Sequence, residues 1–223
     1  MKYLSLNSKL KFPSFDITLN ECKNNCEYGS KSRLCYALNN PRTMVYNINK
    51  LRNNEKLLNS SLFVKIMVKE ILLSNFRKIR IFSSGDLYSI DQLEKIINVC
   101  EQLPFIKFWL STKNHYILSQ YFKDKKNTLK NLNIILSNQI PNSEFPEFLL
   151  NWCKEKNIFM SKTTNKKSLS NCHASVNKTS CQNCENCFNG IDIVYFLHGK
   201  YAKDRLKKYD CLLYTSPSPR DRQ

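Results

Sequence analysis

The sequence lacks any apolar run close to the roughly 20 residues that a membrane-spanning helix needs. Its first residues, MKYLSLNSKLKFPSF, alternate polar and apolar side chains and lack the continuous apolar core of a signal peptide. We therefore expect neither a membrane span nor export, and we predict a cytoplasmic protein. At 223 residues, with 42% hydrophobic and 24% charged residues, the chain has the size and composition of one globular domain.

Glycine is scarce, with four residues, and acidic residues are outnumbered by basic ones. A formal net charge of +17 is typical of proteins that bind nucleic acid. However, 27 of the 35 basic residues are lysines scattered along the chain, a bias that an A/T-rich coding sequence also produces at tolerant surface positions. A nucleic-acid partner is therefore one hypothesis, and an ordinary lysine-rich surface is the other.

The C-terminal stretch 211–223 reads CLLYTSPSPRDRQ and resembles the translation of a sequencing adapter. We therefore expect one α/β domain over residues 1–210, followed by an artefactual tail that carries no fold or site. Within the domain we expect a cysteine loop at about residues 20–37 and a cysteine-rich insertion at about residues 170–190.

Short β-rich runs alternate with amphipathic segments through the middle of the chain. Strands are predicted at residues 78–84, 106–112, 132–137, 157–162 and 191–197. Helices are predicted at residues 36–52, 62–73, 90–100, 116–122 and 147–156. This alternation predicts βαβ crossovers and a mostly parallel sheet. An open doubly wound sheet and a partial (β/α) barrel both fit the pattern.

Polar residues follow the predicted strands, where such folds place their active sites. Ser84, Gly85 and Asp86 come after one strand, Lys113 after the next and His198 after the last. Lys113 suits an anionic substrate or cofactor group, and a solvated lysine is the alternative. Asp86 is also a candidate N-cap for the helix that follows it.

Cysteine is abundant, with ten residues, and in a chain without an export signal this favours metal or cluster ligation over disulfides. Near the C-terminal end, Cys181, Cys184 and Cys187 form C-x2-C-x2-C, and Cys172 precedes them. Thiolates this close suit an iron–sulfur cluster or a zinc ion. We expect Cys100 and Cys153, which stand alone on predicted helices, to be buried apolar side chains.

A second group, Cys22, Cys26 and Cys35, has the spacing C-x3-C-x8-C. Three thiolates leave one position of a four-iron cluster without a protein ligand, and an open position is where a metal site does chemistry. A fourth ligand from His115 or His198 would instead close a structural zinc site. The remaining alternative is three cysteines without a metal.

Four segments taken in order resemble the phage-encoded gene product 88 family. They are Cys22 to the Cys35-Tyr36-Ala37 triplet, RIFSSGDLYS (80–89), KFWLSTK (107–113) and CQNCENCFNG with a later Leu-His pair. The layout is in turn similar to that of the radical S-adenosylmethionine (SAM) enzymes. Those enzymes place three cysteines in the first loop of a partial β/α barrel, where a four-iron cluster binds the amino and carboxylate groups of SAM.

That resemblance implies roles for particular residues. Cys22, Cys26 and Cys35 would ligate a [4Fe-4S] cluster. Tyr36 matches the aromatic residue often found beside the last of these cysteines. Ser84, Gly85 and Asp86 would contact the SAM amino group, and the late cysteine quartet would hold an auxiliary cluster.

We therefore predict an α/β protein with a mostly parallel sheet, arranged as a partial (β/α) barrel like that of the radical SAM enzymes. The expected function is that of an iron–sulfur, radical-SAM-like enzyme of phage or mobile-element origin, served by an electron donor. A zinc-stabilised nucleic-acid-binding protein without catalysis is the alternative.

Overall fold

The computed structural model describes residues 1–6, 10–19, 22, 26, 35, 47–139, 141–177, 180–181 and 184–197. Within them one sheet contains β1 (Leu4–Leu6), β2 (Pro13–Phe15), β3 (Lys78–Ile81), β4 (Lys107–Thr112), β5 (Leu132–Ser137), β6 (Phe159–Thr164) and β7 (Ile193–Phe196). The helices are α3 (Ile48–Leu58), α4 (Phe63–Ser74), α5 (Ile90–Gln102), α6 (His115–Tyr121), α7 (Glu147–Glu155) and α8 (His173–Asn177). Two short 3-10 helices, η2 (Lys167–Leu169) and η3 (Asn186–Phe188), precede and follow α8.

The strands lie across the sheet in chain order, from β1 to β7. β1 pairs antiparallel with β2, and every later neighbouring pair is parallel. A doubly wound sheet reverses its strand order at a switch point, and the described strands show no reversal. The predicted α/β class with a mostly parallel sheet is therefore confirmed, and the sequential order is consistent with a partial (β/α) barrel.

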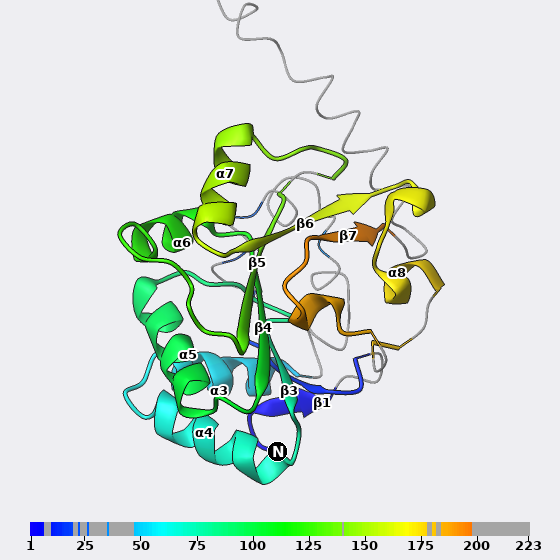
Figure 1. The fold of residues 1–223 in the computed structure, drawn as a ribbon. Coiled ribbons are helices and arrows are strands. Elements are labelled where there is room, and N and C mark those ends of the chain that lie inside the picture. Colours follow the sequence, from blue (N-terminus) through cyan, green and yellow to red (C-terminus); the bar gives the residue numbers. More distant parts are fainter. Residues whose placement is uncertain are drawn as a thin grey trace, which may run out of the picture.

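Two layers cover the sheet. Helices α4 to α7 lie along one face, here called the helix face, and α8 lies on the opposite side, the inner face (Figure 1). Because successive strand residues point to opposite faces, Phe108 and Leu110 of β4 join the helix-face core, while Trp109 joins a second core with Phe12 and Phe188. None of the helices in the described ranges is long and apolar enough to cross a membrane.

Most predicted elements match the structure within two residues, and β5 matches at both ends. The helix predicted at residues 36–52 is displaced: α3 runs from Ile48 to Leu58, and residues 36–46 lie outside the described part. Strands β1 and β2 were not predicted. Each has three residues, which is too short for a strand period to be recognised in the sequence.

Cys100 of α5 and Cys153 of α7 are fully buried, as predicted. Burial raises the pKa of the Cys153 thiol to about 12, and the nearby Asp192 carboxylate adds to the effect. The folded chain therefore keeps this proton at alkaline pH, whereas the unfolded chain releases it near the ordinary thiol value of 9.0.

We predict that Cys153 makes the protein less stable as the pH rises from about 9 towards 12. In that window the folded chain binds more protons than the unfolded chain, so the free energy of unfolding falls with pH. Replacing Cys153 with Ala removes this contribution. Urea titrations under reducing conditions measure the free energy of unfolding at pH 8 and pH 10.5. The decrease between these pH values should be smaller in the variant than in wild type. An exposed helix substitution, Gln120→Ala, should leave the loss unchanged, and equal losses in Cys153→Ala and wild type would contradict the prediction.

Candidate functional site

The loop that follows β3 is held in place by a buried carboxylate from the loop that follows β2. Asp16 Oδ1 accepts hydrogen bonds from the backbone N–H groups of Ser83 and Ser84, at 2.6 and 3.1 Å, and from the Ser83 hydroxyl at 2.7 Å. Its Oδ2 accepts from the Ser14 hydroxyl at 2.6 Å. One side chain therefore ties together the carboxyl ends of two neighbouring parallel strands.

Gly85 lies where this loop crosses closest to the chain after β2. Its φ of +86° is a conformation that other L-residues rarely adopt. A Cβ atom at this position would lie 2.3 Å from Ile17 Cγ1 and 3.0 Å from the Thr18 carbonyl oxygen. Glycine is thus required here both by the backbone conformation and by the close approach of the two loops.

Asp86 joins the β3 loop to the end of β4. Its carboxylate accepts from Leu87 N–H at 2.7 Å, from Lys113 N–H at 2.9 Å and from the Thr112 hydroxyl. Burial raises the pKa of this carboxyl, and the Thr112 and backbone hydrogen bonds oppose that shift. The prediction that Asp86 caps the next helix is wrong, because Ser89 is the N-cap of α5 and accepts from Gln92 N–H at 3.2 Å.

Lys113 extends from the end of β4 into the same region. Its Nζ donates to the Asn138 carbonyl oxygen, beyond the end of β5, at 2.7 Å. Burial lowers the pKa of this ammonium group, and the nearby Cys26 thiol and Asp86 carboxylate oppose the shift. Lys113 as a whole is partly exposed, but its amine is held by the Asn138 carbonyl oxygen and lies near the cysteines and Asp86.

Three thiols lie beside Asp86 and Lys113. Cys26 is buried, and Cys22 and Cys35 pack against it. The pKa of the Cys22 thiol is raised, first by its hydrogen bond with Cys26, then by burial and by the Asp86 carboxylate. The structure thus brings together all three cysteines of the first group, here called the thiol triplet, although eight residues separate the last two.

Three other residues expected at the triplet are not found beside it in the described part of the chain. Tyr36 and His198 lie outside the described residues, and His115 is an exposed residue at the start of α6. Within the described ranges, no three His, Cys, Asp or Glu side chains are arranged so that they could hold a metal ion as they stand. The chemistry of the triplet nevertheless suits an iron–sulfur cluster, because thiolates are its usual protein ligands and Lys113 offers a compensating charge.

The second group of cysteines lines one cavity on the inner face, and we call it the thiol quartet. Cys172, Cys181, Cys184 and Cys187 share this cavity with aromatic residues, among them Phe12, Trp109 and Tyr195. A backbone hydrogen bond of 3.2 Å from Cys184 N–H to the Cys181 carbonyl closes the C-x2-C turn. The structure therefore brings the four predicted cysteines together around one cavity, and this cavity is separate from the triplet.

The cysteine-rich segment is anchored near the amino ends of the central strands. Glu185 forms ion pairs with Lys78 of β3 and Lys107 of β4, and these lysines lower the pKa of its carboxyl. Asn133 of β5 donates to the Cys187 carbonyl oxygen at 3.2 Å. Phe188 of η3 packs edge-on against Trp109, with ring centroids 6.0 Å apart. The quartet thus lies towards the strand ends opposite to those that position the triplet.

Two functional positions were missed in the sequence. Asp16 was not singled out, because its partners lie 67 and 68 residues away. Arg80 of β3 stacks over the Trp109 ring at 4.3 Å and lies near the Cys187 thiol. The alternation of charged and apolar residues in Lys78–Ile81, which puts Arg80 within a strand of a mostly parallel sheet, was the available signal.

A family model described as gene product 88 matches residues 2–211 of the chain. No curated protein and no solved structure matches the chain.

Proposed function

The chain belongs to the gene product 88 family, and we propose that it is an iron–sulfur enzyme of the radical SAM type whose cluster is held by the thiol triplet. The observation that carries the proposal is the packing of Cys22 and Cys35 against Cys26 beside Asp86 and Lys113. Three thiols at the carboxyl ends of parallel strands match the position of active sites in barrel-like folds.

Residues of this chain would prepare the site in two ways. When bound, a four-iron cluster with three cysteine ligands supplies an electron and an open position for the amino and carboxylate groups of SAM. Lys113 would balance the negative charge of the three thiolates. Asp16 and Gly85 would hold the Ser84–Asp86 loop against the triplet, so that the loop lies next to the methionine part of SAM.

The inner face beyond the triplet offers polar contacts for a substrate. Ser111 Oγ lies 2.9 Å from Ser137 Oγ, and Ser137 Oγ lies 2.8 Å from Ser161 Oγ. These hydroxyls come from three adjacent strands and form a continuous row, near the carboxyl ends of β4 and β5 and midway along β6. We propose that the row orients a polar substrate next to SAM.

The first test measures iron and acid-labile sulfide in protein purified without oxygen. We expect wild type to contain iron and sulfide in similar amounts, and the Cys22→Ala, Cys26→Ala, Cys35→Ala triple variant to lose both. Wild type incubated with SAM and a strong reductant should also form 5′-deoxyadenosine. Cys100→Ala removes a buried thiol away from the triplet and should keep its iron and sulfide. Wild type that contains zinc and no sulfide would refute the proposal.

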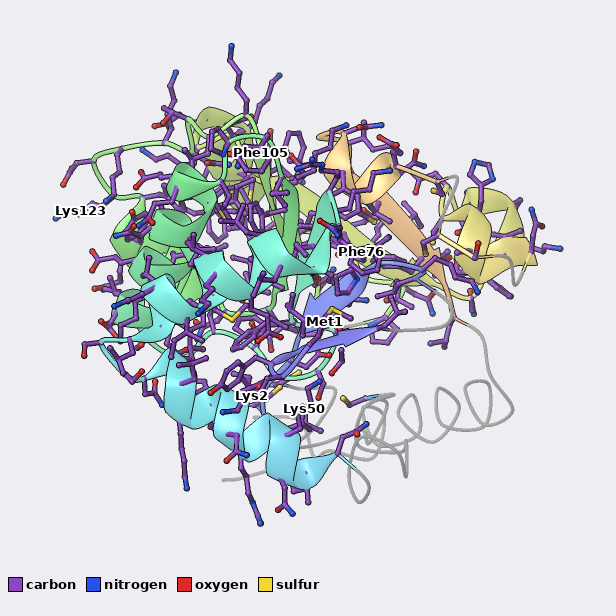
Figure 2. All side chains as sticks on the ribbon, turned by 90° about the horizontal axis from the view of Figure 1, so that it is seen from below. Met1, Lys2, Lys50, Phe76, Phe105 and Lys123 are labelled. Atoms are coloured by element: carbon purple, nitrogen blue, oxygen red, sulfur yellow. The ribbon has the colours of Figure 1, made fainter. Side chains whose placement is uncertain are left out.

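Exposed lysines favour a second candidate function, nucleic-acid binding. The loop between α6 and β5 exposes Lys123, Lys125, Lys126 and Lys130, and Lys123 projects from the edge of the molecule (Figure 2). Such lysines would contact phosphates and release counterions, so binding would weaken steeply with salt. Titration of labelled DNA and RNA at several salt concentrations tests this function, and binding that is weak and insensitive to salt would exclude it.

A further inference from the structure

The thiol quartet has an environment unlike that of the triplet. Its cavity has a volume of about 30 Å³ and is lined mainly by apolar and aromatic side chains. That is room for about one water-sized group. A four-iron cluster would add eight atoms between the thiols, whereas a single metal ion would add one.

Trp109 gives a second and independent indication of a ligand. The residue is 4% exposed and lines the cavity, and within the described part of the chain its indole Nε1–H has no hydrogen-bond acceptor. A buried donor without a partner is costly. Thiolate sulfurs bound to a metal ion carry negative charge and would provide the missing acceptor.

Two further groups in or beside this cavity would stabilise negatively charged sulfurs, one as a hydrogen-bond donor and one as a positive charge. The Tyr195 hydroxyl lies 3.7 Å from Cys187 Sγ, within reach of a hydrogen bond to sulfur. The guanidinium of Arg80 lies near the same thiol and stacks on Trp109. Four thiolates around a divalent ion carry a net charge of −2, which a neighbouring arginine partly balances.

We propose that Cys172, Cys181, Cys184 and Cys187 bind a single zinc ion in a closed four-thiolate site, with Trp109 and Tyr195 donating hydrogen bonds to its sulfurs. In the described part of the chain these sulfurs are not yet arranged around a metal ion, so the ion would draw them to the Zn–S distance of about 2.3 Å. The ion holds the cysteine-rich segment on the inner face of the sheet, where Glu185 and Phe188 already anchor it. The site is therefore structural, and the chemistry stays at the other end of the strands.

This proposal refines the iron–sulfur proposal by assigning different metals to the two cysteine groups, and each can fail alone. Zinc bound at the quartet does not depend on iron at the triplet. The triple alanine variant of the triplet should therefore lose iron and sulfide but keep one zinc per chain.

The test uses the full chain, reduced and titrated with Zn²⁺ or with Co²⁺ as a coloured probe. The triple alanine variant of the triplet should bind one ion per chain, and Co²⁺ should give the intense absorption of a tetrahedral four-thiolate site. Adding Cys184→Ser and Cys187→Ser to that variant should abolish this stoichiometric binding. Cys153→Ala is the matched control, because it removes a buried thiol outside the quartet and should bind normally.

Trp109→Phe keeps all four ligands and tests the site without depending on the folding of a cysteine variant. Its zinc affinity, measured against a competing chelator, should fall about tenfold. Zinc should also change the fluorescence of wild type, and this change should disappear in Trp109→Phe, where Trp152 is the remaining tryptophan. Iron and sulfide retained by the quartet in the triplet variant, or a quartet that binds no metal, would overturn the proposal.

Discussion

Replacing Asp16 with Ala should lower the free energy of unfolding by about 3 kcal/mol, because it removes several hydrogen bonds to one buried carboxylate. The N–H groups of Ser83 and Ser84 would lose their shared acceptor at 2.6 and 3.1 Å. These donors lie in a loop whose backbone is also constrained by Gly85 and by the hydrogen bond from Ile17 N–H to the Ser84 carbonyl. The loop can therefore not turn its amides to water without separating from β2.

A graded pair of variants separates this role from a general effect of lost charge. Asp16→Asn keeps an oxygen that can accept the three hydrogen bonds now made to Oδ1. It should therefore lower the free energy of unfolding by less than half as much as Asp16→Ala does. Asp124→Ala removes an exposed carboxylate and should change stability little. Urea unfolding followed by circular dichroism measures all three. A loss below about 1 kcal/mol in Asp16→Ala would show that the loop is held by other contacts.

The regular elements could be predicted because their signal is local. LNIILS at residues 132–137 is a continuous apolar run, as expected for a strand buried on both faces, and it forms β5. The chain order of the strands could not be predicted, since a partial barrel and a doubly wound sheet use the same βαβ units. That choice depends on which strand each crossover reaches, and this is decided by packing between distant segments.

Site residues could be predicted when their type and spacing indicate a metal site, and they were missed when their role depends on contacts with distant parts of the chain. The cysteines of both groups were found from their spacing, and the structure gathers each group. Asp86 was predicted to follow a strand at residues 78–84, but β3 ends at Ile81, and Asp86 lies in the loop after it. Ser89, three residues later, is the helix N-cap, and Asp86 instead binds the end of β4. Asp16 gave no local signal, because its role depends on hydrogen bonds from Ser83 and Ser84 in the distant β3 loop.

Among the residues that are not cluster ligands, Lys113 is the one whose replacement should most affect the metal content of the triplet. Three thiolates in contact repel one another and the Asp86 carboxylate, so their ionised form needs a compensating charge. The Lys113 ammonium lies close to all three cysteines and to Asp86. In Lys113→Met the side chain keeps its length and apolar body but loses that charge. The variant should therefore fold, because an apolar group replaces a buried amine, yet it should hold its cluster weakly.

After anaerobic reconstitution and exposure to a chelator, we expect Lys113→Met to hold about one tenth of the iron and sulfide of wild type, or less. A loss of this size is typical when a group that supports metal ligands is removed. Lys126→Met makes the same chemical change at an exposed position and should match wild type. The free energy of unfolding, measured before reconstitution, separates the two possible causes of a loss. An unchanged or higher value together with low iron identifies Lys113 as the counter-charge of the triplet. A variant that retains iron like wild type would show that the thiolates are balanced from elsewhere, and the case for a cluster beside Asp86 and Lys113 would lose its electrostatic support.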